Sequence, residues 1–121
     1  MMSDIKGKYR TLVKRLYEKT IEDEVSWEQS WNSELMCSIG GQEIYLKATR
    51  NAEGEPVELI ELRDDDSRVM DSITDEFIAG QPPGVPGFDT WFELMTSLHQ
   101  TARRKALGVD AAVDRILKNL D

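Results

Sequence analysis

The sequence predicts a single α+β domain: a three- or four-stranded antiparallel β-meander packed against an N-terminal helix and two C-terminal helices. Apolar residues recur at helical spacing at both ends of the chain, whereas apolar and polar residues alternate in the middle. A Gly-Gly pair also joins two of the alternating segments. Because strand-forming segments are grouped between helix-forming ones, the order favours α+β over an alternating α/β fold. A chain of 121 residues has the length of one domain, so residues 1–121 are treated as one unit.

The first segment, to about Ile21, is expected to be an amphipathic helix. Its apolar residues recur at spacings of three and four and form one stripe: Ile5, Tyr9, Leu12, Val13 and Leu16. Lysines and arginines flank the stripe on both sides, where their aliphatic parts can cover the edge of a core. We therefore interpret the stripe as a core-packing surface.

A short extended piece follows the first helix, because Val25 and Trp27 alternate with polar residues. Trp27 and Trp31 are expected to pack in the core or at its edge. A platform on which a ligand stacks is the alternative for these two rings.

The middle of the chain predicts the meander. Residues 35–39 and 44–49 alternate in polarity, and Gly40-Gly41 between them suits a type I′ hairpin turn. A third strand is predicted over residues 57–63. Residues 68–78 fit either a fourth strand or a helix, because Val69, Ile73 and Phe77 also recur at a spacing of four.

The last third predicts a connector and two helices. Residues 80–87 contain three prolines and three glycines, so this loop is expected to be a turn-rich passage from the sheet to the helices. Thr90 and Glu93 form a capping box before a helix that runs to about Leu107. Gly108 can end that helix, and Asp110 is expected to cap a final short one. The final helix carries a second apolar stripe: Val113, Ile116, Leu117 and Leu120.

The net charge of −8 is unevenly distributed. Residues 1–20 hold six Lys/Arg and two acids, residues 21–90 hold four and seventeen, and residues 91–121 hold five and four. An acidic middle repels phosphates, so direct nucleic-acid binding is not expected. We interpret the basic first helix as lying against the acidic middle of the same molecule, with an anionic partner as the alternative.

Few residues offer chemistry for a catalytic or cofactor site. One cysteine and one histidine exclude a zinc site built by the protein itself, and no glycine-rich nucleotide-binding motif occurs, so no cofactor is expected. A catalytic pair of Cys37 and His99 is a minor alternative to a buried thiol and a structural histidine. The acidic triplet Asp64, Asp65 and Asp66 fails the EF-hand pattern and is interpreted as a solvated turn, with no metal.

These observations favour a non-enzymatic protein-binding module of the adaptor, antitoxin or inhibitor kind. Its expected partner is another protein with a basic surface, and its expected interaction surface is the turn of Asp64, Asp65 and Asp66. A structural homo-oligomeric subunit, such as a homodimer, and a small enzyme using carboxylates or Cys37 are the alternatives. The first residues contain no apolar leader and the single cysteine cannot form an internal disulfide, so a cytoplasmic location without membrane contact is expected.

Overall fold

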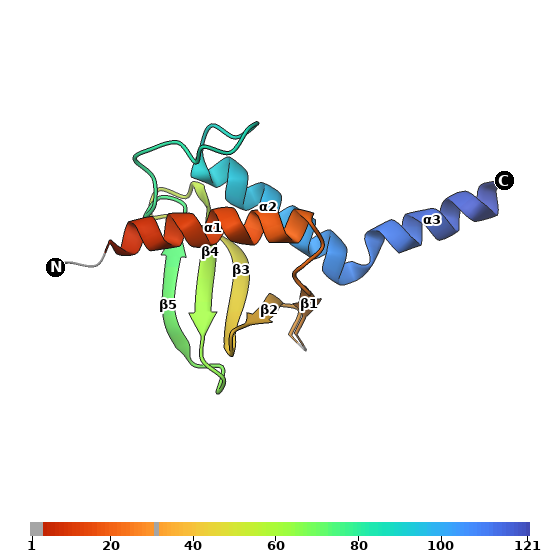
Figure 1. Cartoon of the computed structure of the whole chain (residues 1–121), viewed down its shortest axis with the longest axis horizontal. Helices are drawn as coiled ribbons and strands as arrows, with labels where there is room; N and C mark the ends of the chain where they lie inside the picture. The colour runs from red at the N-terminus through yellow and green to blue at the C-terminus, as the bar shows by residue number, and fades with distance from the viewer. Residues whose placement is uncertain (1–3, 31) are drawn as a thin grey trace.

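The structure is a computed structural model that describes residues 4–30 and 32–121. Within these residues, three helices and five strands follow one another (Figure 1). They are α1 (Ile5–Ile21), β1 (Glu28–Gln29), β2 (Leu35–Ile39), β3 (Gln42–Arg50), β4 (Pro56–Arg63), β5 (Val69–Thr74), α2 (Trp91–Leu107) and α3 (Val109–Leu120). The expected α+β class, with one N-terminal and two C-terminal helices, is confirmed.

The sheet is an antiparallel meander of five strands in the order β1-β2-β3-β4-β5, so the expected number of three or four was too low. The additional strand is β1, in which Glu28 pairs with Met36 and Gln29 pairs with Leu35. Two residues are too few to show an alternating pattern, and only their pairing with β2 makes them a strand.

The predicted hairpin is confirmed. Gly40 and Gly41 have φ angles of 60° and 80°, the positive values that a type I′ turn requires at both central residues. Residues 69–74 form a strand, because β5 pairs with β4 and places Ile73 opposite Ile60. The helical alternative for this segment was therefore wrong.

Both long helices lie on the same face of the sheet. Their buried side chains share one core with every second residue of the strands, such as Ile44, Leu46 and Ile60. The helices contribute Tyr9, Val13, Leu16, Trp91, Leu94, Met95, Leu98 and Ala102. The intervening strand residues, including Tyr45 and Lys47, point to the opposite face, which no described helix covers.

Trp27 packs in this core, as expected, and its indole Nε1 donates a hydrogen bond to Thr20 Oγ1 at 2.9 Å. This bond ties the start of the sheet to the end of α1. Trp31 lies outside the described residues.

The Pro/Gly loop is attached to both long helices. Arg10 on α1 donates hydrogen bonds to the carbonyl oxygens of Ile78 and Ala79, just before the loop, at 2.8 and 2.9 Å. Within the loop, the Gln81 carbonyl accepts a 2.8 Å bond from Trp91 Nε1 at the start of α2. Prolines prevent this segment from joining a helix or a strand. Side chains of α1 and α2 therefore hold it in place by binding its backbone carbonyl groups.

The basic residues of α1 contact the middle of the chain in two ways. The ion pairs of this helix in the described part join Lys19 to Glu22 and Glu24, which follow in sequence. Lys6 lies over the ring of Phe77 at 5.4 Å, and Arg10 binds carbonyls. In the described part, the basic helix thus contacts the middle of the chain, but its ion pairs there are those of Lys19 with Glu22 and Glu24, which follow the helix.

The C-terminal helices are joined without a loop. The capping box at Thr90 and Glu93 is present, and Gly108, with φ 65°, both ends α2 and begins α3. Asp110 is therefore inside α3, and its expected role as the cap was wrong. From Gly108, α3 leads away from α1 and the sheet (Figure 1).

In the part of the chain that the structure describes, no helix has the length and apolar character needed to cross a bilayer.

Candidate functional site

The acidic triplet Asp64, Asp65 and Asp66 forms the turn between β4 and β5, as expected. Oδ1 of Asp64 accepts hydrogen bonds from the backbone N–H groups of Asp66 and Arg68, each at 2.9 Å. These bonds, mainly the one from Arg68, hold the pKa of Asp64 below its ordinary value. Asp64 is therefore a structural residue of the turn.

Arg68 reduces the negative charge of the same turn. Its guanidinium lies 3.3 Å from Asp64 Oδ2 and 3.2 Å from Asp66 Oδ2. The three carboxylates lie within 4.8 Å of one another, the closest approach to a cation site among the described residues, but an internal cation already pairs with two of them. Asp65 is the member that has no recorded polar contact in the described part.

Cys37 does not have the surroundings of a nucleophile. Its side chain faces the core from β2, the residue is 1 % exposed, and burial raises the pKa of its thiol to about 12. The described hydrogen bonds connect His99 to Glu58, not to Cys37. The structure thus places the two candidate catalytic residues in different contacts.

Glu58 and His99 form an interaction that sequence reasoning missed. His99 Nδ1 on α2 lies 2.8 Å from Glu58 Oε1 on β4. The backbone N–H of Glu58 donates to Asp75 Oδ1 at 2.8 Å, and burial raises the pKa of Asp75. This chain of contacts joins α2 to β4 and to the residue that follows β5. Because 41 residues separate Glu58 from His99, no local sequence pattern predicts their contact.

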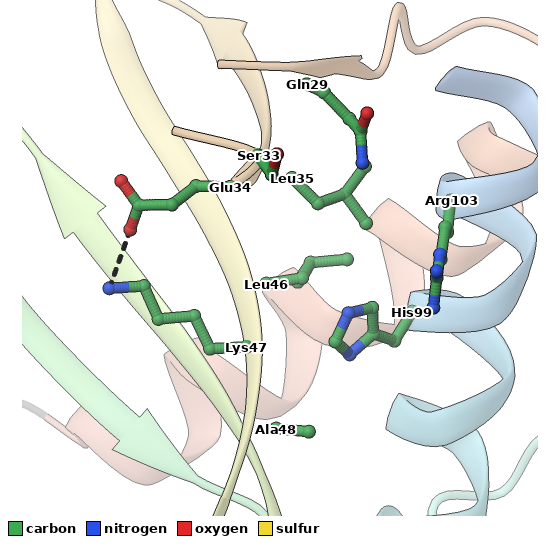
Figure 2. A pocket seen from close by; sticks show the side chains of 9 residues that line it. All are labelled: Gln29, Ser33, Glu34, Leu35, Leu46, Lys47, Ala48, His99 and Arg103. Carbon is green, nitrogen blue, oxygen red and sulfur yellow. Dashed lines mark ion pairs between the residues drawn. The ribbon is translucent and has the colours of Figure 1, made fainter. Parts of the chain in front are cut away.

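A cavity of about 660 Å³ lies between α2 and the first three strands (Figure 2). His99 and Arg103 project into it from α2, facing Leu35 and Leu46 across it. Ser33 also lines the cavity, but no hydrogen bond joins its hydroxyl to His99 among the described contacts. The cavity therefore combines His99, whose Nδ1 contacts Glu58, and the Arg103 guanidinium with an apolar wall.

The open face of the sheet carries a four-membered charge network. Lys47 lies 2.9 Å from Glu34 and 3.3 Å from Glu61, and Arg63 lies 3.0 and 2.6 Å from the same two residues. The Arg63 guanidinium also stacks 3.7 Å from the centre of the Tyr45 ring. Figure 2 shows Glu34 and Lys47 pointing away from α2. Each charge in the network has two opposite partners.

This network lowers the pKa of Glu34 to about 2, mainly through its hydrogen bond to Lys47. The bond also raises the pKa of Lys47. Both side chains remain charged at neutral pH, so the network stabilises the folded sheet rather than supplying a titrating acid or base.

α3 has the largest exposed apolar surface that the structure describes on one element. Ile116 and Leu120 are 60 % and 76 % exposed, and Val113 and Leu117 are about half exposed. No residue of α3 is buried, and its main contacts are with α2. The sequence predicts this apolar stripe from its helical spacing, but no other described element covers it.

Comparison with models of known protein families, with curated proteins and with solved structures found no match to this chain.

Proposed function

We propose that this protein is a non-enzymatic protein-binding module that engages its partner through the apolar stripe of α3. The observation that carries the proposal is that α3 has one continuous apolar side and buries none of it. An amphipathic helix with anchors at i, i+3, i+4 and i+7 is a common way to fill an apolar groove on another protein.

The length of α3 supports the same conclusion. A helix of 12 residues is marginally stable in water without packing. Docking of its apolar side onto a partner supplies the missing packing. The stripe thus supports a binding role more strongly than the acidic turn does, because Asp64 and Asp66 already pair with Arg68.

The charge distribution is a second feature of the proposed binding. Residues 21–90 carry thirteen more acids than bases, which favours encounter with a basic protein surface. A partner with a basic rim around an apolar groove would therefore suit this chain best.

A photocrosslinking amino acid introduced at Ile116 tests the proposal in cells that make the protein. Ala111 provides the matched control, because it lies exposed on the opposite side of the same helix. We expect a discrete crosslinked protein from position 116 and little crosslinking from position 111. Equal crosslinking from both positions would remove α3 as the binding surface.

A further inference from the structure

The structure offers an apolar groove that matches α3. The groove lies between α1, the segment after it and the end of β2, and has a volume of about 360 Å³. Leu12, Leu16 and Val25 form its floor, and Ile39 stands 46 % exposed at its edge. Ile39 thus extends the apolar lining of the groove into one continuous apolar surface.

The rim of this groove is basic on the α1 side. Arg15 and Lys19 line it there, with Glu24 beside Lys19. Lys19 pairs with Glu24 at 2.9 Å, whereas no ion pair of Arg15 is recorded among the described residues. Arg15 is therefore the rim cation that has its charge available for a partner.

α3 carries the complementary charges. Asp110 and Asp114 are spaced by four residues, so they lie along one flank of its apolar stripe, and Asp121 follows the last residue of the helix. Lys118 lies four residues after Asp114, beside the same flank, whereas Arg115 lies on the side opposite the stripe. A groove with a basic rim on one side thus suits α3 in one orientation.

The apolar stripe of α3 and the α1 side of the groove have the same length. The stripe from Val113 to Leu120 and the α1 side of the groove from Leu12 to Lys19 each cover seven helical steps, about 10 Å. Two turns of α3 therefore fit alongside two turns of α1.

We propose that the partner of α3 is a second copy of this chain, with the α3 of each copy seated in the α1–β2 groove of the other. The proposal rests on the proposed binding role of α3 and names its partner. Each copy gives one helix and receives one, as a twofold dimer requires. The basic surface expected of the partner is then α1 of the second copy.

Direct pairing of two α3 helices is the other way in which two copies could cover these stripes. In an antiparallel pair the same flanks meet and the residue numbers run in opposite directions, so Asp114 would face the region of Lys118 in the second copy. In a parallel pair the acidic flank would meet Ala112 and Asn119, which carry no positive charge. The groove arrangement differs from both because it also requires Ile39 and Arg15.

Sedimentation equilibrium and light scattering test the dimer with the whole chain. We expect twice the chain mass of 13.8 kDa for the native protein. Ile116→Glu on α3 and Ile39→Glu at the groove should each give a monomer, and Ala111→Glu on the opposite side of α3 should leave the dimer intact. A native monomer at high micromolar concentration would overturn the proposal.

Mixing the two monomeric variants distinguishes the groove from direct helix pairing. Ile39→Glu keeps an intact α3, and Ile116→Glu keeps an intact groove, so the mixture should form a heterodimer with one complete contact. Pairing of two α3 helices predicts instead that Ile39→Glu remains a dimer by itself, which would refute the proposal.

Charge reversal provides a test at exposed residues that do not threaten folding. Arg15→Asp should weaken the dimer roughly fivefold per contact, and on the order of 25-fold for two contacts. Adding Asp114→Arg to Arg15→Asp should recover most of that loss. If the two substitutions weaken the dimer additively, Arg15 of one copy does not contact Asp114 of the other.

If the chain is a monomer but position 116 still crosslinks another protein, the binding role of α3 stands and the proposal of a second copy is wrong. If position 116 crosslinks nothing above the control, the binding role itself fails.

Discussion

Replacement of Glu34 by glutamine tests how much the charge network on the open face stabilises the sheet. Glu34 bridges Lys47 and Arg63 at 2.9 and 3.0 Å, and the amide would remove one of the two carboxylates that each cation contacts. A pKa lowered from 4.5 to about 2 corresponds to an upper limit of about 3 kcal/mol. Because the Glu34 side chain is 20 % exposed to water, we expect about 1–2 kcal/mol at neutral pH.

The sign of the pH dependence follows from the direction of the shift. The pKa of Glu34 is lower in the folded protein, so its stabilisation is complete above the ordinary pKa of 4.5 and is lost as the pH falls towards 2. The difference in unfolding free energy between the native chain and Glu34→Gln should therefore be largest at about pH 7 and less than half as large at about pH 3.

Urea unfolding followed by circular dichroism measures both differences, at one fixed protein concentration because self-association adds to stability. Glu53→Gln is the control, since no contact of the Glu53 side chain is recorded in the described part, and it should change stability little at either pH. A loss for Glu34→Gln that is equal at the two pH values would refute the electrostatic explanation.

Two further predictions concern Cys37 and Gly108. The buried thiol, with its pKa raised to about 12, should react with a disulfide reagent at pH 8 at least ~100-fold more slowly in the folded protein than in urea; comparable rates would show that Cys37 is accessible. Gly108→Ala should lower the unfolding free energy by about 1 kcal/mol, because alanine disfavours the φ of 65° between α2 and α3. An unchanged urea midpoint and slope would show that this junction does not need a left-handed residue.

Local signals made several elements predictable. The Gly40-Gly41 turn and the capping box of Thr90 and Glu93 depend on residues a few positions apart, and the structure contains both. Each combines a backbone geometry with side chains that satisfy it nearby, so the sequence alone carries the information.

The sequence left the secondary structure of a segment ambiguous where only pairing with a distant strand decides it. Residues 68–78 fit a helix or a strand because Val69, Ile73 and Phe77 suit both spacings, and the contact of Ile73 with Ile60 on β4 settles the segment as a strand. β1 was missed for the same reason, since two residues become a strand only when β2 lies beside them.

The candidate binding surfaces also combine features that the sequence shows with features that only the tertiary structure shows. The apolar stripe of α3 is readable from its spacing, because a helix turns by a fixed angle per residue. Its exposure is not readable, since the same pattern describes a helix packed on the core. Likewise, the contact of His99 with Glu58 and the groove beside Ile39 join segments far apart in the chain. The sequence by itself determined the three helices, the Gly40-Gly41 hairpin and the apolar side of each helix. The tertiary structure decided β1, the strand at residues 69–74 and which apolar sides are covered, because pairing and burial depend on what the fold places beside them.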